Sequence, residues 1–182
     1  MMHHNKTFLF ICIFALLLGL LSMSVSNQRY QQAKLAEEQI GEAVNMLSEN
    51  LTQIEENLNT LDIIYQTAES YNLPPELLLA MMKVESNFDQ YAVSSQGCAG
   101  LMQISPIHNV ADVFDISVNV DFGASYISTL IKESEDLHEA LGKYNRGQVG
   151  YSKFCKETNQ RVTEYSQKIT DYMNDLNGKT AD

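Results

Sequence analysis

The sequence is poor in basic residues and lacks the patterns of several common functional sites. It holds 12 Lys and Arg against 23 Asp and Glu, has a formal charge of −11, and shows no cluster of basic residues. We therefore expect no nucleic-acid partner. Its histidines are scattered, and no His or Cys pair has zinc-site spacing, so we expect no metal and no cofactor. A G-x-S-x-G motif, a phosphate-binding loop and a credible cysteine nucleophile are likewise missing.

Strand patterns are also missing, because no region alternates apolar and polar residues convincingly. We expect an all-α protein, in which 182 residues provide one domain of ordinary size and an extension. Outside an apolar N-terminal segment only two cysteines remain, Cys98 and Cys155. In an oxidising compartment they could form one disulfide, or they stay as two free thiols, and the sequence favours neither outcome.

The apolar segment covers residues 8–21, follows Lys6, and reaches 18 residues with the weakly polar stretch up to Val25. That length is long for the core of a signal peptide and marginal for a membrane-spanning helix. Small residues that could form a cleavage site follow at Ser22, Ser24 and Ser26. We predict that residues 1–26 are a signal peptide or a membrane anchor. In both cases the rest of the chain lies outside the cytoplasm, in the periplasm or cell envelope, anchored or secreted.

A heptad pattern follows, with apolar residues alternating in steps of four and three. It predicts one long helix from about residue 30 to residue 69, within a helical spacer at 27–69. The positions beside the pattern show poor charge complementarity. The helix could therefore be a spacer, or pack on the domain that follows it or on a partner's helix, or form a true coiled coil, and these roles stay open. The pattern consists of Ile40, Val44, Leu47, Leu51, Ile54, Leu58, Leu61 and Tyr65.

Glu85 lies near the end of the next predicted helix, which begins at Pro75 and is apolar almost all round. An apolar helix that carries a carboxylate removes it partly from water, which disfavours the charged form. Such a carboxyl group can donate a proton near neutral pH, as the general acid of glycoside cleavage does.

Five motifs follow one another from this glutamate onward. They are Glu85-Ser86; Ser94 and Gly97 before Gly100-Leu101-Met102-Gln103; Asn119, Gly123 and Tyr126; Tyr144-Asn145-Arg146-Gly147; and Tyr165-Ser166-Gln167-Lys168-Ile169. Together they resemble the catalytic domain of the soluble lytic transglycosylases, relatives of goose-type lysozyme that cut bacterial peptidoglycan. Lys143 and Cys98 depart from the family pattern, because each replaces an alanine.

The resemblance implies a lysozyme-like helical domain over residues 70–182 and a single catalytic acid, Glu85. In this family one glutamate acts first as acid and then as base. The C6 hydroxyl of N-acetylmuramic acid attacks its own C1 and closes a 1,6-anhydro ring. By the same resemblance Ser94, Gln103, Tyr144 and Asn145 bind the substrate, although a serine or asparagine there could instead cap a turn.

Within this domain the sequence also predicts four local features. A short helix should run through Leu101 and Met102, and Asn119 should cap the helix that follows. The long side chain of Lys143 should point to solvent. Gly100 and Gly147 should serve backbone geometry.

The resemblance predicts a lytic transglycosylase that cleaves the bond between N-acetylmuramic acid and N-acetylglucosamine. It would remodel the wall, or open it for a secretion, conjugation or phage apparatus. Its partners would be glycan strands, the membrane if the N-terminal helix is uncleaved, and such a wall-spanning apparatus. Two alternatives stay open: a lysozyme-type hydrolase on the same fold, which needs a second carboxylate, and a non-catalytic wall-binding assembly protein.

Overall fold

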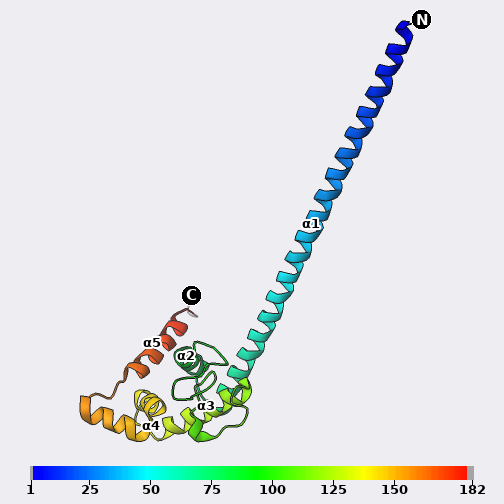
Figure 1. Ribbon diagram of the computed structural model, residues 1–182. Coiled ribbons are helices and arrows are strands. Elements are labelled where there is room, and N and C mark those ends of the chain that lie inside the picture. The colour runs from blue at the N-terminus through cyan, green and yellow to red at the C-terminus, as the bar shows by residue number, and fades with distance from the viewer. Residues whose placement is uncertain (1, 180–182) are drawn as a thin grey trace. The chain divides into compact units, whose positions relative to one another are not determined.

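The computed structural model describes the backbone of residues 2–179 and the side chains of residues 13–178. In this range no β-strand forms, apart from two isolated bridges that join Ala99 to Val93 and to Ile104. The prediction of an all-α protein is confirmed. The α-helices, labelled in Figure 1, are α1 (Met2–Tyr71), α2 (Pro75–Glu85), α3 (Ile116–Lys132), α4 (Leu137–Thr158) and α5 (Glu164–Lys179). A short 3-10 helix, η1 (Pro106–His108), lies between α2 and α3 in the sequence.

The chain divides into two compact units, Met1–Glu55 and Glu56–Asp182, and α1 belongs to both. The predicted divisions after residues 26 and 69 stay predictions. Among the described residues no helix has the length and apolar character needed to cross a membrane. The predicted apolar segment begins at Phe8, so part of it lies outside the side chains that the structure describes.

Helix α1 contains the predicted heptad helix, and its apolar stripe lies at the surface. The eight stripe residues, Ile40 to Tyr65 in the order given above, each expose between 39% and 64% of their area. Two other residues of α1, Ile64 and Ala68, are buried in the core of the second unit. The helix is therefore confirmed, whereas its role as a spacer or as a coiled coil stays a prediction.

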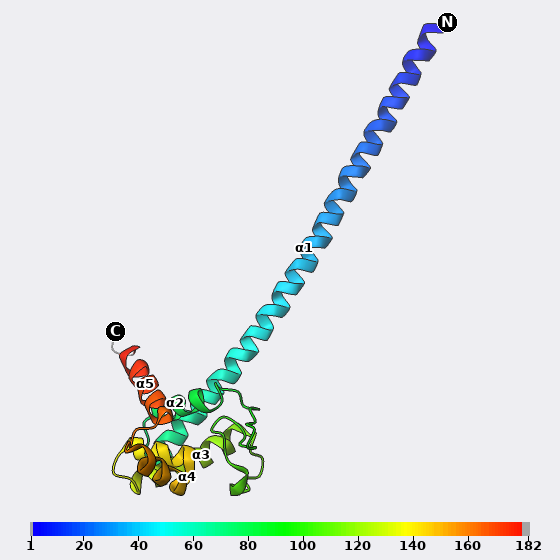
Figure 2. The same ribbon diagram turned by 60° about the vertical axis from the view of Figure 1, so that its left-hand side comes forward.

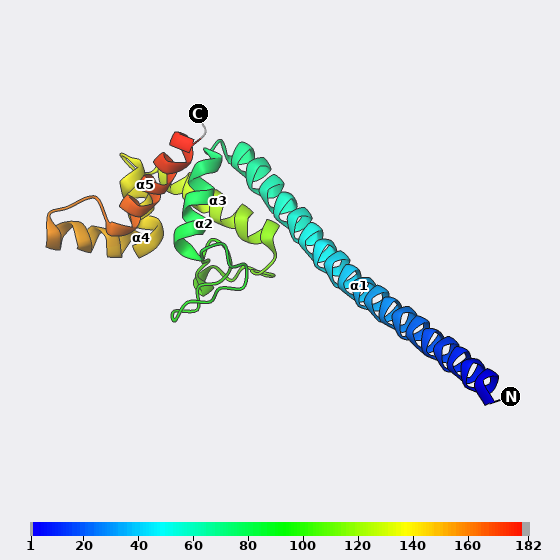
Figure 3. The same ribbon diagram turned by 90° about the horizontal axis from the view of Figure 1, so that it is seen from above.

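In the second unit α2 packs against α5, and α4 packs against both α3 and α5. Figures 1 and 2 show these four helices gathered together. The long connection between α2 and α3, residues 86–115, contains only the short η1. Figure 3 shows this connection at the C-terminal end of α2, the end that carries Glu85. The fold thus places the predicted acid beside the loop that holds the glycine-rich motif.

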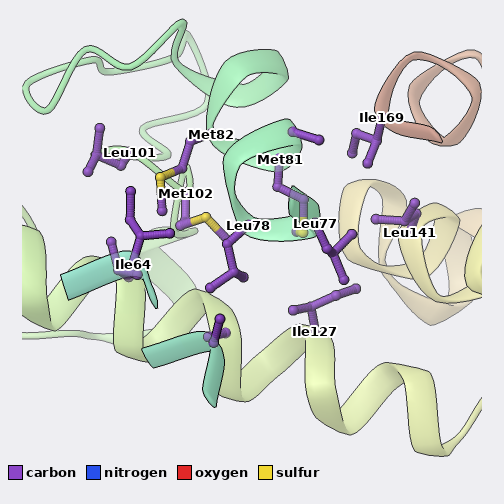
Figure 4. Close-up of a cluster of buried hydrophobic side chains, with 14 of the residues drawn as sticks. Ile64, Leu77, Leu78, Met81, Met82, Leu101, Met102, Ile127, Leu141 and Ile169 are labelled. Carbon is purple, nitrogen blue, oxygen red and sulfur yellow. The ribbon is translucent and has the colours of Figure 1, made fainter. Parts of the chain in front are cut away.

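The core forms around α2, which has Pro75 at its first turn and an apolar sequence from Leu77 to Met82. Burial of these side chains is the main favourable term that fixes α2 among its neighbours. Figure 4 shows residues of α2 facing side chains from five other parts of the chain. The labelled residues are Leu77, Leu78, Met81 and Met82 of α2, Ile64 of α1, Leu101 and Met102 of the loop, Ile127 of α3, Leu141 of α4 and Ile169 of α5.

Two local predictions about α3 and α4 are wrong. Asp115, not Asn119, caps α3, because its carboxylate accepts a hydrogen bond from the backbone N–H of Val118 at 3.1 Å. The Lys143 side chain is buried instead of solvent-exposed. Its ammonium group lies 2.8 Å from a Glu139 carboxylate oxygen, and it donates to the Glu133 carbonyl at the end of α3, so a local ionic partner offsets the cost of burial.

The two remaining cysteines do not pair in this structure. Cys98 and Cys155 are both free, half-buried thiols. Of the two outcomes that the sequence left open, the structure therefore has the free thiols.

Candidate active site

Glu85 is the last residue of α2, where the chain leaves the core. The turn that follows is fixed by Ser86, whose hydroxyl donates to the carbonyl of Met82 at 3.1 Å and of Leu101 at 3.0 Å. The second of these bonds ties the end of α2 to the glycine-rich loop. Glu85 is thereby held at the junction of a rigid helix and the loop, as the sequence predicts.

The Glu85 carboxyl group is half-buried, and burial raises its pKa to about 7. One contact opposes this effect. The hydroxyl of Tyr165 on α5 donates a hydrogen bond to Oε1 of Glu85 at 2.5 Å, which lowers the pKa because it stabilises the charged form. Burial has the larger effect, so the group is poised to exchange a proton near neutral pH.

Two tyrosines near Glu85 remain neutral phenols. Burial, and next the charge of Glu85, raise the pKa of both Tyr144 and Tyr165 well above its usual value. Tyr144 donates its hydroxyl proton to the Met102 carbonyl at 2.9 Å, and so connects α4 to the glycine-rich loop. Both rings therefore act as fixed hydrogen-bond donors and not as bases.

The glycine-rich loop is a set of tight turns, so the predicted helix through Leu101 and Met102 is wrong. Asn119 explains its shape: the buried amide accepts from the N–H of Met102 at 2.7 Å and donates to the carbonyls of Ala99 and Val113. Gly100 has φ +78°, and a Cβ there would lie 2.1 Å from Nδ2 of Asn119. The Asn119 side chain thus replaces the bonds that a helix would make.

Two predicted substrate contacts also stabilise this loop. Ser94 Oγ accepts from the N–H of Cys98 at 3.1 Å. Nε2 of Gln103 donates to the carbonyls of Ala92 and Gly100, each at 3.1 Å. Gln103 therefore offers a ligand chiefly its amide oxygen.

A cleft of about 430 Å³ brings all five predicted site residues together. Glu85, Ser94, Gln103, Tyr144 and Asn145 all line it. Further neutral polar side chains face the same space, which suits an uncharged hydroxyl-rich ligand. These are Ser95, Gln96 and Ser105.

One wall of the cleft is aromatic. The His108 ring lies 5.0 Å from Phe122 and 5.2 Å from Tyr126, and the Tyr126 ring lies 5.4 Å from Tyr144. The motifs pointed to Tyr126 and Tyr165 but not to their contacts. Nothing in the sequence marked His108 or Phe122, because η1 and α3 bring them together only in the fold.

Glu85 is the one carboxyl group among the described residues that line the cleft. Three other acids have different partners. Asp89 accepts from the N–H of Tyr91, Asp115 caps α3, and Asp121 accepts from the Tyr71 hydroxyl at 2.9 Å. In the described part of the chain no three His, Cys, Asp or Glu side chains gather as metal ligands would.

Comparison with known families identifies the domain. The family model of the transglycosylase SLT domain matches residues 62–167, more than half of the chain. The chain belongs to the SLT domain family.

Relatives of this SLT domain agree with that assignment. The membrane-bound lytic murein transglycosylase C of Yersinia enterocolitica is 35% identical over 85 residues, which cover 38% of this chain and 24% of that protein. The membrane-bound lytic murein transglycosylase E of Buchnera aphidicola is 33% identical over 90 residues, 41% of each protein. The chain thus spans well under half the length of these relatives.

Solved structures share the fold. The 70 kDa soluble lytic transglycosylase of Escherichia coli has a TM-score of 0.53 and 18% identity over 62% of this chain and 23% of that protein. An inactive variant of the lytic transglycosylase Slt of Pseudomonas aeruginosa has a TM-score of 0.54 and 21% identity over 64% and 24%. At these identities the likeness establishes the lysozyme-like fold of the SLT domain and nothing more.

Proposed function

We propose that this chain is a peptidoglycan lytic transglycosylase with Glu85 as its acid and base. The observation that carries the proposal is a single half-buried carboxyl group, with a pKa of about 7, in a cleft whose other described lining residues include no carboxylate. Ordinary glycosidases need two such groups. A reaction in which one group serves twice fits this site.

The reaction needs one proton to leave Glu85 and one to return. Protonated Glu85 donates to the glycosidic oxygen while the bond from that oxygen to C1 of N-acetylmuramic acid breaks. The C6 hydroxyl of the same sugar then bonds to C1 and gives its proton to the Glu85 carboxylate. The enzyme ends in its starting protonation state, and the tethered nucleophile needs no positioned water.

The surrounding residues have separate roles in this proposal. Tyr165 holds Oε1 of Glu85, which leaves Oε2 for proton transfer, and Tyr144 and Asn145 border the reacting sugar. Ser94 and Gln103 shape the loop and present oxygen atoms to the substrate. The aromatic wall supplies apolar area against which sugar rings can pack.

The names of the relatives support a site of action outside the cytoplasm, because several are membrane-bound murein transglycosylases. We propose that the chain acts on glycan strands in the cell envelope. Its N-terminal segment would hold it to the membrane if that segment is not removed. By opening the wall locally, the enzyme would make room for a wall-spanning apparatus.

Analysis of the products tests the proposal. Wild-type protein incubated with purified sacculi should release muropeptides lighter by one water molecule than hydrolysed ones, as the anhydro ring requires. Glu85→Gln should retain its fold, by circular dichroism, and lose about 10³-fold or more in rate, because it removes the transferable proton. Hydrated ends would show a lysozyme-type hydrolase. Equal lysis by Glu85→Gln would show that Glu85 is not the acid, and absence of lysis by the wild type would favour a wall-binding protein.

A further inference from the structure

Arg146 is the third residue of the Tyr144-Asn145-Arg146-Gly147 motif and lines the cleft. It is the one Lys or Arg among the described residues that do so. The chain as a whole has a formal charge of −11, so at long range it repels an anionic polymer. Arg146 is a local positive charge within this negative surrounding. A positive group placed in the cleft suggests that the ligand carries a negative group there.

The Arg146 side chain is held in place without an acidic partner. Its guanidinium carbon lies 4.8 Å from the centroid of the Phe154 ring, within the range of a cation–π contact. Gly147, with φ +68°, bends α4 immediately after it. Stacking on an aromatic face leaves the N–H groups at the edge of the guanidinium plane available for a ligand.

Arg161 shows the contrast within the same domain. Its guanidinium nitrogens lie 2.7 to 3.4 Å from carboxylate oxygens of Glu135, Asp136 and Glu139. Among the described ion pairs none involves Arg146, although the protein offers nearly twice as many acidic as basic residues. Arg161 therefore has a structural role, because it joins the α4–α5 loop to the residues around the start of α4. The Arg146 guanidinium, by contrast, remains available to a ligand in the cleft.

We propose that Arg146 binds a carboxylate of the peptide stem that glycan strands carry, and so makes the enzyme prefer strands with charged stems. This inference rests on the proposed function. The sugars of the strand are neutral, so its anionic groups are the carboxylates of the stem. A planar guanidinium fork matches a carboxylate with two parallel hydrogen bonds, which an amide of the same size cannot accept equally well.

Matched substrates test the proposal. Glycan strands with native stems, and the same strands with stem carboxyls converted to amides, are compared by kcat/KM for release of anhydro products. The wild type should prefer the native strands about three- to five-fold, as for a solvent-accessible ion pair, and the preference should shrink as salt is added. Arg146→Gln should bring the ratio to about one. Arg146→Lys, which keeps the charge and loses the fork, should give an intermediate ratio.

Lys156→Gln is the matched control, because Lys156 is exposed on α4 outside the cleft lining. It should keep the wild-type ratio. A wild-type ratio of one, or an unchanged preference in Arg146→Gln, would overturn the inference alone. Failure of the wild type to release anhydro products from either substrate would overturn the proposed function and this inference with it.

Discussion

Leu51 on α1 and Leu78 on α2 both belong to apolar faces of helices, yet they have opposite surroundings. Leu51 exposes 54% of its area, whereas Leu78 is fully buried among side chains of the second unit. Apolar residues therefore predict a helix in both regions, as a heptad stripe around Leu51 and as a continuous apolar run around Leu78, but neither pattern says whether the rest of the chain covers those side chains. Around Leu78 burial fixes the helix, and with it the position of Glu85, whereas the stretch of α1 around Leu51 is exposed.

The two regions should differ most in how much the free energy of unfolding falls when these leucines are truncated to alanine. Leu78→Ala should lower the free energy of unfolding by about 2 to 5 kcal/mol, because it leaves a cavity in the core. Leu51→Ala should change it by no more than about 0.5 kcal/mol. Urea unfolding followed by circular dichroism measures both. A large loss in Leu51→Ala would mean that the stripe is covered in solution, for example by a second copy of the chain.

Polar side chains should show the same contrast on a smaller scale. Lys143 is buried against Glu139, whereas Lys34 on α1 is exposed. Lys143→Ala should cost about 1 to 3 kcal/mol, because it leaves the Glu133 carbonyl and Glu139 without their shared partner. Lys34→Ala should be nearly neutral in the same unfolding experiment. If the two variants were equally stable, the buried position of Lys143 would be wrong.

Tyrosine substitutions extend the comparison to catalysis. Tyr165 stabilises the ionised form of Glu85, so Tyr165→Phe should raise the pKa of Glu85 further. The alkaline limb of the pH profile of kcat/KM, where Glu85 loses its proton, should therefore move to higher pH. The maximal kcat/KM should fall about ten-fold. Tyr65→Phe, at an exposed position of α1, should leave the profile unchanged. A shift to lower pH in Tyr165→Phe would contradict the contact.

The sequence predicted correctly those features that depend on neighbouring residues in the chain. Pro75 and the apolar run after it predict α2, and the end of that run places Glu85 correctly. The family resemblance named five site residues, and all five line one cleft. The direction of the pKa shift of Glu85 could also be predicted, because an apolar helix partly buries a carboxyl group at its end.

Predictions failed where a distant residue decides the outcome. Asn119 looked like a helix cap, but its amide instead satisfies backbone groups up to 20 residues away. The segment around Met102 looked helical, but those bonds and Gly100 fold it into turns. Lys143 looked like a surface residue, because the sequence does not show that α3 ends beside it. The contact of Tyr165 with Glu85 spans 80 residues and had no local signal.

Titration of Glu85 itself tests the central claim most directly. Carbon NMR of the glutamate carboxyl groups, in the wild type and in Glu85→Gln, follows each group as pH changes. We predict one carboxyl resonance that titrates near pH 7 and is absent from Glu85→Gln. A wild-type spectrum in which every glutamate titrates near its ordinary value of 4.5 would contradict the account, because Glu85 would then be an ordinary solvent-exposed carboxylate.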